Sequence, residues 1–335
     1  MYCYLGVESP NTAKRHVDQL MARMGYADLS VQTGKGAVAR FFCKLFSMFN
    51  LLSKLKAGDV LVIQYPFKKF YVTQCRIARM KGAKTITLIH DLGTFRRRKL
   101  TAEQEIRRLS HTDVIIGHNP TMNAWLVEHG CKVPLVSLDI FDYLSEAEPS
   151  ADVHRRGSEP VFVFAGGISW RKSAFIYQID SVIGGCRFVL YGSGLEQGAD
   201  ASWTNSTYCG HIGSDDFIRS AATKADWGLV WDGDTVDGCT GVWGDYLRLN
   251  NPHKASFYLR AGLPVIVWRE SAMAPFVCDN GLGIAVGSLS ELPERLRAIT
   301  DDEYAALKKN AMSMKDKLND GYHFRRAVEA ALKTL

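Results

Sequence analysis

The sequence from residue 161 to 173 is Val161-Phe-Val-Phe-Ala-Gly166-Gly167-Ile-Ser169-Trp-Arg171-Lys172-Ser173. Its first positions are apolar without alternation, which is typical of a strand buried on both faces of a parallel sheet. The two glycines allow a tight turn, and the polar residues after them suit the start of a helix. A buried strand that leads through a glycine turn into a helix is the repeating unit of doubly wound α/β proteins.

The same pattern recurs along the whole chain of 335 residues. Short apolar runs predict strands at Cys3–Val7, Val60–Gln64, Thr85–Ile89, Val114–Gly117, Leu135–Leu138, Val161–Ala165, Arg187–Tyr191, Gly228–Trp231, Pro264–Trp268 and Ile284–Val286. Segments of helical period separate them, at Thr12–Met24, Phe70–Met80, Thr121–Glu128, Ser214–Thr223, His253–Arg260, Asp302–Lys317 and Arg325–Leu332. Apolar strands joined by helices predict parallel sheets that are covered on both faces.

The pattern lapses between Ser145 and Pro160, where the sequence is polar and has no apolar period. This stretch is the best candidate for a linker between domains. We therefore predict an α/β protein with two Rossmann-like doubly wound domains, residues 1–148 and 158–335, which face a central cleft. The last helix is expected to pack back on the first domain. In such sheets, ligands bind at the carboxyl ends of the strands.

The composition excludes several classes of protein. With 47% apolar and 23% charged residues, the chain is too apolar to be disordered. No apolar run approaches the ~18 residues of a membrane-spanning helix, and no signal peptide is recognisable at the start. We expect a cytoplasmic protein, with the inner face of the membrane as a more specific location. The 8 cysteines form no CxxC pair, which favours buried thiols over zinc ligands or disulfides.

The net charge of +6 is unevenly distributed. Residues 1–150 hold 21 Lys and Arg against 13 Asp and Glu, whereas residues 151–335 hold 20 against 22. A basic first half indicates an anionic partner, such as a membrane surface or a substrate with phosphates. Because no nucleic-acid-binding signature accompanies this charge, we expect no nucleic-acid partner. The apolar segment Phe41–Lys54 predicts a core or oligomer contact, and membrane-surface binding is the alternative.

Two segments of the second half suggest binding of phosphate. Gly167 lets a ligand approach the backbone, and Arg171 is a cation at a helix start. The alternative is a tight turn followed by solvated cations. In Asn250-Asn251-Pro252-His253-Lys254, Asn is expected to cap a helix and Pro to occupy its first turn. Lys254 then opposes the helix dipole, which is explained if an anion binds there; a solvated lysine is the alternative.

Two further loops follow strands of the second half. Tyr191-Gly192-Ser193-Gly194 lacks the glycine spacing of a dinucleotide fingerprint, so we expect a tight turn at a ligand site and no nicotinamide cofactor. The loop with Asp232, Asp234 and Asp237 lacks the glycine and glutamate of a calcium loop. A flexible loop that contacts substrate, a metal-binding D-x-D motif and a plain surface turn remain as its interpretations.

In the first half, His90 and Asp91 close an apolar strand. A histidine and a carboxylate at a strand end can accept a hydroxyl proton as a general base. Alternatively, the two side chains tie down a loop. The cations Arg96, Arg97, Arg98 and Lys99 follow and add to the basic character of this half.

Taken together, these motifs identify a family. The chain, to about residue 330, resembles the bacterial GT-B-fold glycosyltransferases of the glucosyltransferase-3 type, which are often named β-1,6-galactofuranosyltransferases. The segments that carry the resemblance are Asp59–Pro66, Leu88–Asp91, Ile115–Asn119, Gly228–Asp234 and Asn250–Trp268. Singly, only the last of them is specific.

The resemblance implies a nucleotide-sugar donor on the second domain and an acceptor on the first. It places the donor diphosphate near Arg171 and Lys254, and the nucleoside near Tyr191–Gly194 and Tyr208–Gly213. Retaining enzymes of this fold carry a glutamate soon after the lysine, and here Phe257 and Tyr258 stand in that region. A contact to the ribose or a sugar hydroxyl is then expected from Asn251 or from the loop Asp232–Asp237.

We predict that the protein transfers a hexosyl group, glucose or galactofuranose, from a UDP-sugar to a hydroxyl of a glycan or glycoprotein acceptor. The expected mechanism is inverting, with no metal and no cofactor. Asp91 or His90 would take the acceptor proton, and the cations would neutralise the leaving diphosphate.

Several partners follow from this prediction. The acceptor is expected to be a polysaccharide precursor on a lipid carrier or a glycosylated protein. The basic first domain predicts peripheral membrane contact, and a homo-oligomer is a further expectation. The alternatives are a non-catalytic homologue that binds or stabilises a partner, and a nucleotide-dependent oxidoreductase.

Overall fold

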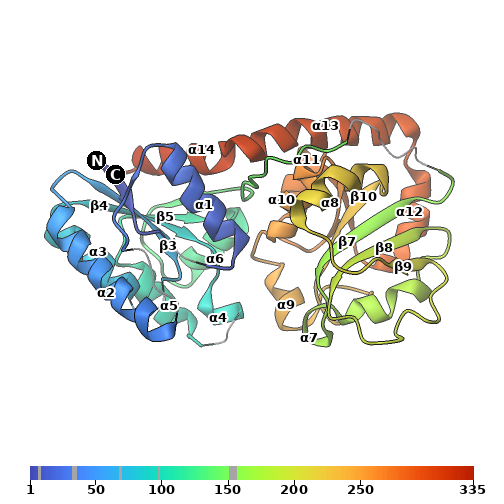
Figure 1. The fold of residues 1–335 in the computed structure, drawn as a ribbon, viewed down its shortest axis with the longest axis horizontal. Helices are drawn as coiled ribbons and strands as arrows, with labels where there is room; N and C mark the ends of the chain where they lie inside the picture. Colours follow the sequence, from blue (N-terminus) through green and yellow to red (C-terminus); the bar gives the residue numbers. More distant parts are fainter. Residues whose placement is uncertain (7–8, 32–35, 68–69, 97–98, 151–156) are drawn as a thin grey trace. The chain divides into compact units, whose positions relative to one another are not determined.

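The computed structural model describes residues 1–6, 9–31, 36–67, 70–96, 99–150 and 157–335. Arg97 and Arg98 of the predicted cation run, Val7 of the predicted first strand and part of the predicted linker lie outside these residues. The chain divides into two compact units (Figure 1). The first comprises Met1–Asp142 and Gly321–Leu335, and the second comprises Tyr143–Asp320. None of the helices in the described ranges is both long and apolar enough to cross a membrane.

The first unit contains a six-stranded parallel sheet in the order β2-β1-β3-β4-β5-β6. The strands are β1 Tyr2–Tyr4, β2 Ala27–Asp28, β3 Val60–Tyr65, β4 Lys84–Ile89, β5 Val114–Gly117 and β6 Leu135–Ser137. The helices of this unit are α1 Thr12–Arg23, α2 Ala37–Lys54, α3 Tyr71–Met80, α4 Gly93–Arg96, α5 Ala102–Leu109, α6 Pro120–Glu128 and α14 Tyr322–Leu332. Every residue of β3 is buried, as a strand covered on both faces requires.

The second unit contains another six-stranded parallel sheet, in the order β12-β11-β10-β7-β8-β9. Its strands are β7 Val161–Gly167, β8 Arg187–Ser193, β9 Ser206–Tyr208, β10 Trp227–Val230, β11 Val265–Trp268 and β12 Gly283–Val286. The α-helices are α7 Trp170–Ser173, α8 Ser214–Ser220, α9 Gly241–Tyr246, α10 His253–Arg260, α11 Ala274–Asp279, α12 Leu292–Ala298 and α13 Asp301–Asp320. Short 3-10 turns lie at Ala174–Tyr177, Ile179–Ser181, Ala221–Thr223 and Leu289–Glu291. The two sheets confirm the predicted doubly wound α/β architecture.

The strand order of the second sheet indicates where a ligand is expected to bind. β7, the first strand of this unit, pairs with β8 on one side and with β10 on the other. The chain therefore builds the sheet first in one direction and then in the other, with the switch between β7 and β10. In open α/β sheets, ligands bind beside the carboxyl ends of the strands at this switch. The residues that follow β7 and β10 lie at this switch.

The boundary between the two units lies after Asp142, earlier in the chain than the predicted end of the first domain at residue 148. Residues 143–148, which the sequence analysis assigned to the end of the first domain, belong to the second unit, and residues 321–335 belong to the first. The chain returns to the first unit at Gly321. Just beyond this point, Asp142 accepts hydrogen bonds from the backbone N–H groups of His323 at 3.1 Å and Phe324 at 2.7 Å, which caps α14. This cap ties the last helix to the first unit.

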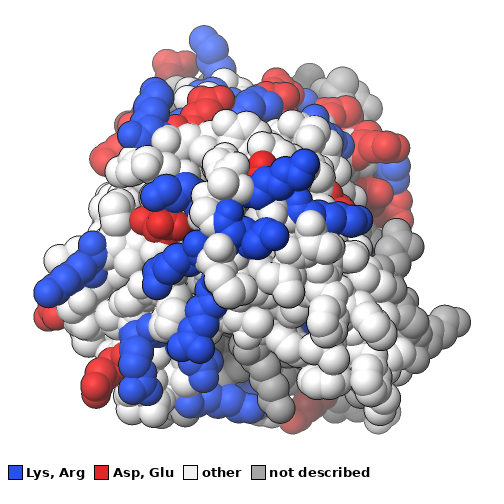
Figure 2. All heavy atoms as spheres, turned by 90° about the vertical axis from the view of Figure 1, so that its left-hand side faces the viewer, with Lys and Arg blue, Asp and Glu red and all other residues white. Residues whose placement is uncertain are grey.

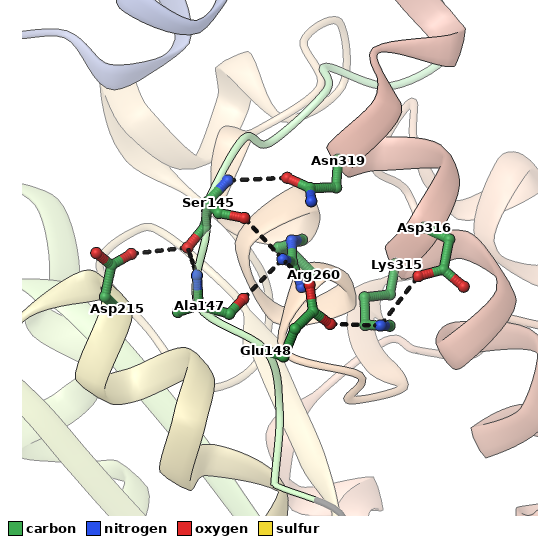
Figure 3. Close-up of polar contacts among 8 residues, drawn as sticks. All are labelled: Ser145, Ala147, Glu148, Asp215, Arg260, Lys315, Asp316 and Asn319. Carbon is green, nitrogen blue, oxygen red and sulfur yellow. Dashed lines mark hydrogen bonds and ion pairs between the residues drawn. The ribbon is translucent and has the colours of Figure 1, made fainter.

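A buried arginine explains why residues 143–148 belong to the second unit (Figure 3). Arg260, at the end of α10, is fully buried and donates to the carbonyl oxygens of Ser145 at 2.8 Å and Ala147 at 2.6 Å. It also pairs with Glu148 at 2.7 Å, which Lys315 of α13 contacts at 2.6 Å. Because a buried charge is retained only where it is paired, this segment is fixed to the second unit.

Candidate functional site

The N-terminus of α10 lies at the switch point, but its cap differs from the prediction. The residue that caps the helix is Pro252, in extended conformation, and no side chain accepts a capping hydrogen bond. The helix has the predicted bounds, His253–Arg260, but the expectation of an asparagine cap with proline in the first turn is wrong, because Pro252 itself is the residue before the helix. Asn251 is buried beside this turn, and Lys254 lies within it, as predicted.

Lys254 forms a buried ion pair with Asp232, the second residue after β10. Its Nζ donates to Asp232 Oδ1 at 3.1 Å and lies 3.8 Å from the centre of the Phe164 ring. The Lys254 side chain is only 11% exposed. Burial lowers the pKa of Lys254 to about 8, against the opposing effect of the Asp232 carboxylate. The ammonium is thus poorly solvated and favours a further anion.

A second lysine approaches the same carboxylate. Lys172 Nζ lies 3.8 Å from Asp232 Oδ1 and is about one third exposed, at 32%. Two ammonium groups therefore share one carboxylate, which leaves a net positive charge beside the carboxyl ends of β7 and β10. Such a charge in a partly desolvated position is suited to hold a phosphate. The sequence analysis assigned the cationic role to Arg171 and did not select Lys172 as a site residue.

Arg171 and Gly167 lie on the open side of this group. Arg171 is exposed, with its guanidinium carbon 5.9 Å from the centre of the Trp243 ring. A Cβ added at Gly167 would meet nothing within 4 Å, so the turn is accessible to a ligand. Its neighbour Gly166 is closer to the lysine, because a Cβ there would lie 3.8 Å from Lys254 Cε. The helix α7 is a single turn, so it adds little N-terminal dipole.

The loop after β10 holds Asp232 in place through its backbone. Gly233 donates to the Lys172 carbonyl at 2.8 Å and adopts φ +127°, which suits glycine alone. A Cβ at this position would lie 2.6 Å from the Thr240 carbonyl oxygen. The loop is thus folded closely onto the start of α7. This backbone contact brings Asp232 within reach of both lysines.

The other carboxylates of this loop lie elsewhere. The Asp234 carboxylate lies against Gly241, where an added Cβ would come within 2.2 Å of its Oδ2, and the Asp237 carboxylate accepts from the Ser288 hydroxyl at 3.3 Å. Within the described part of the chain, no group of three or more His, Cys, Asp or Glu side chains could hold a metal ion. The donor set present, one aspartate held by two lysines, does not suit a divalent cation.

The two glycines at the carboxyl end of β8 are required by packing. A Cβ at Gly192 would collide with the carbonyl oxygen of Gly166, and one at Gly194 with that of Ile168. Tyr191 is buried, and its hydroxyl lies 3.5 Å from Lys224 Nζ. These contacts hold the ends of β7 and β8 together and explain both glycines without a ligand. They leave the predicted nucleoside contact of Tyr191–Gly194 as a prediction.

Tyr258 lies one turn after Lys254 on α10, and it has a structural role. It is fully buried, and its hydroxyl accepts a hydrogen bond from the Ala165 backbone N–H at 2.8 Å. Its ring packs on Gly228 of β10, where a Cβ would collide with it. Tyr258 therefore fixes α10 against β7 and β10, and with it the position of Lys254.

In the first unit, His90 and Asp91 follow β4, as predicted. His90 is buried, and its ring stacks on Phe141 at 5.2 Å with an interplanar angle of 20°. Asp91 is only partly buried and is thus the more accessible of the two. This placement favours Asp91 over His90 as the group that meets a substrate.

A second histidine completes the aromatic group around Phe141. His118 is fully buried, lies edge-on to Phe141 at 4.9 Å and places its Nε2 3.0 Å from the Ile89 carbonyl oxygen. Burial lowers the pKa of His118 to about 4, so the ring is neutral at pH 7. His118 is therefore a packing partner that supports the backbone before His90.

The loop after Asp91 is anchored by a buried carboxylate. Glu105 of α5 is fully buried and accepts from the backbone N–H and the hydroxyl of Thr94, at 2.7 and 2.9 Å. The hydroxyl of Tyr65 donates to the other oxygen of Glu105, and burial raises the pKa of Tyr65. The sequence analysis did not identify Glu105, because a single glutamate in a helical segment carries no signal of burial.

Comparison with known proteins agrees with these two units. The family model described as the C-terminal domain of glucosyltransferase 3-like proteins matches residues 162–331, and the model of their N-terminal domain matches residues 7–140. The chain is 31% identical over 328 residues to β-1,6-galactofuranosyltransferase WbbI of Escherichia coli (strain K12), with 96% of this chain and 94% of that protein covered. It is 22% identical over 334 residues to glucosyltransferase 3 of Streptococcus gordonii, covering 94% and 95%.

A solved structure shows the same fold. The apo form of the lipopolysaccharide outer core galactosyltransferase WaaB aligns with a TM-score of 0.61 over 98% of each chain, at 10% identity. This likeness confirms the predicted two-domain GT-B architecture. Because the identity is low, it carries the fold alone.

Proposed function

This chain belongs to the glucosyltransferase 3-like family and is a glycosyltransferase, and on that basis we propose that it transfers a hexosyl group from a UDP-sugar to a glycan hydroxyl. The named relatives support glucose or galactofuranose as the sugar. Its identity as a glycosyltransferase excludes the alternatives of an oxidoreductase and of a non-catalytic homologue.

The donor diphosphate is proposed to bind at Lys254 and Lys172. The observation that carries this assignment is that two lysines share the single carboxylate of Asp232 at the switch point of the second sheet. The excess positive charge would stabilise the diphosphate as it leaves, which is the role of a metal ion in other transferases. The proposed mechanism therefore needs no metal and no cofactor.

Asp91 is proposed as the general base on the acceptor side. Its carboxylate would take the proton of the acceptor hydroxyl while that oxygen forms a bond to the anomeric carbon. The bond between the anomeric carbon and the diphosphate oxygen breaks, and UDP leaves with the electron pair. A single displacement of this kind inverts the anomeric configuration.

The acceptor is proposed to be a glycan carried on a lipid or a protein, and the reaction to take place on the cytoplasmic side of the membrane. This proposal follows from the assignment as a glycosyltransferase and from the basic first half of the chain, which indicates an anionic surface nearby. A homo-oligomer remains a proposal as well.

The function is tested by UDP release from a panel of UDP-sugars with soluble glycoside acceptors. We expect turnover with one hexosyl donor, unchanged in excess EDTA. Asp91→Asn should lower turnover at least about 100-fold and leave UDP affinity within about twofold, because an acceptor-side base makes no donor contact. Turnover that EDTA abolishes and Mn²⁺ restores would contradict the metal-free mechanism. Full activity of Asp91→Asn would contradict the assignment of the base.

A further inference from the structure

Helix α2 of the first unit exposes a continuous apolar face. The side chains on this face recur every three or four residues, which places them on one side of the helix. They are Val38 (71% exposed), Phe41 (48%), Phe42 (49%), Phe46 (54%), Phe49 (59%) and Leu52 (40%). No other helix in the described part of the chain carries a comparable run of exposed apolar residues.

The opposite side of α2 packs into the core of the first unit. Met48 and Leu51 are buried there, together with Leu55 just beyond the helix. The sequence alone favoured core burial or oligomer contact for the whole segment. The structure shows that core burial accounts for one side only and leaves four phenylalanines exposed. Contiguous exposed apolar surface of this kind marks an interaction site.

The charge around this face is strongly positive. From residue 29 to residue 90 the sequence holds 11 Lys and Arg against a single acidic residue, Asp59. Asp59 is buried and paired with the N-terminal ammonium at 2.7 Å, so it does not offset the surface charge. Exposed cations at the end of α2 and on the adjoining α3 are Lys54, Lys56, Arg76 and Arg79. Figure 2 shows this side of the unit, with a band of Lys and Arg beside a broad uncharged area.

We propose that the exposed apolar side of α2, which we call the α2 face (Phe41, Phe42, Phe46 and Phe49), docks the protein on an anionic lipid bilayer. The helix would lie in the plane of the interface, with its phenylalanines among the upper acyl chains and the cations at its end and on α3 at the headgroups. An exposed aromatic face with cations beside it is the combination that such binding requires. The helix docks on the bilayer without crossing it.

The positive charge beside the α2 face argues against a second copy of the chain as its binding partner. A two-fold interface would place the α2 face against itself and bring two strongly positive surfaces together. That juxtaposition is repulsive, whereas an anionic membrane attracts the same charge. The proposal does not depend on the donor sugar or on the catalytic residues.

The test is flotation of the full-length protein with lipid vesicles in the absence of any sugar donor. Vesicles of phosphatidylcholine with about 30% phosphatidylglycerol should bind the protein, and pure phosphatidylcholine vesicles should bind it much less. Raising the salt from about 0.1 M to about 0.5 M should weaken binding, because the charges are screened. The variant Phe42→Gln/Phe46→Gln/Phe49→Gln should lower the partition coefficient at least about tenfold.

The matched control is Val127→Gln, which removes a 58%-exposed apolar side chain from α6 of the same unit. It should bind vesicles as the wild type does. Lys54→Glu/Lys56→Glu should lose binding to the anionic vesicles while the phenylalanines are intact. Because all these side chains are exposed, each variant should melt as the wild type does. The proposal is overturned if the wild type does not float. It is equally overturned if sedimentation shows a lipid-independent dimer that the triple variant converts to monomer.

Discussion

Two lysine–aspartate pairs flank β10 of the second sheet, one at each end. Asp226 precedes the strand and acts electrostatically on Lys308 of α13, whereas Asp232 follows the strand and forms an ion pair with Lys254 of α10. In both pairs burial lowers the pKa of the lysine to about 8, and the aspartate opposes that shift. By charge and burial alone, the two pairs would be hard to tell apart.

Their surroundings differ. Asp226 accepts a hydrogen bond from the backbone N–H of Val161 at 2.8 Å, while Lys308 Nζ has no hydrogen-bond partner among the described residues. Asp232 is hydrogen-bonded by Lys254 and approached by Lys172 at 3.8 Å. The pair before the strand has one lysine for one carboxylate, and the group after it has two.

We infer the ligand site from its position in the sheet and from the ratio of charges, because a lowered lysine pKa is common to both pairs. The Asp226 carboxylate is used to hold the first residue of β7, which is a structural role at the amino end of the sheet. The Asp232 group lies at the carboxyl end, at the switch point, with an excess cation.

The largest difference between variants of Lys254 and variants of Lys308 should appear in turnover. We expect Lys254→Met to lower kcat/KM for the UDP-sugar at least about 100-fold, because the leaving diphosphate loses its buried cation. Lys308→Met should remain within about twofold of the wild type. Steady-state assays of UDP release measure both. Similar losses in the two variants would mean that the two pairs do not differ in function.

The pH dependence of UDP binding should sharpen the comparison. With its pKa near 8, Lys254 is charged below that pH and neutral above it, so UDP affinity should fall as the pH rises through about 8. The decrease is limited to about tenfold per pH unit. Because Asp232 raises the pKa of Lys254, Asp232→Asn should move the decrease to lower pH. Asp226→Asn is the control and should leave the midpoint unchanged; a shift of equal size in both variants would refute the assignment.

In thermal stability, Lys308→Met should change the protein more than Lys254→Met does, which is the reverse of the order expected for turnover. The pKa of Lys308 is lower in the folded protein than its ordinary value of 10.5, so the unfolded chain binds more protons between about pH 8 and 10.5. The free energy of unfolding of the wild type should therefore rise with pH in that window. Lys308→Met removes part of this rise and should increase Tm at pH 7 by about 2–4 °C. Lys254→Met should gain less, because it leaves Asp232 without its closest partner. Thermal unfolding from pH 7 to 10.5 tests this.

The smallest effect on UDP binding should come from replacing the exposed cation Arg171. Arg171 lies in solvent, so Arg171→Ala should weaken UDP binding only about two- to threefold. Titration of this variant beside Lys172→Met measures the difference. A loss from Arg171→Ala as large as that from Lys254→Met would show that the diphosphate lies on the exposed side of the turn.

Much of the fold could be predicted because its central strands contain continuous apolar runs, such as residues 60–63 of β3. The edge strands could not. Ala27–Asp28 has two residues and Ser206–Tyr208 has three, each pairs with a single neighbour, and neither is uniformly apolar. Their pairing depends on the strand beside them more than on their own sequence.

The site was predicted in part. Lys254 could be identified because a lysine at a helix start is locally unfavourable. Its pairing with Asp232 could not, since it arises from the packing of α10 on β10. Likewise, nothing local distinguishes Lys172 from its neighbour Arg171, and only the fold shows which of them reaches the carboxylate. Arg260 ends an ordinary helical segment, and its burial under residues 145–148 has no local signal.

The central claim is that the donor diphosphate binds the lysine group at the carboxyl end of β10. Calorimetric titration of UDP into the wild type, Lys254→Met and Lys308→Met tests it most directly. We predict that Lys254→Met loses about 1.5–3 kcal/mol of UDP binding, the scale of a charge-assisted contact, and that Lys308→Met binds as the wild type does. A folded Lys254→Met variant with wild-type UDP affinity would contradict the claim.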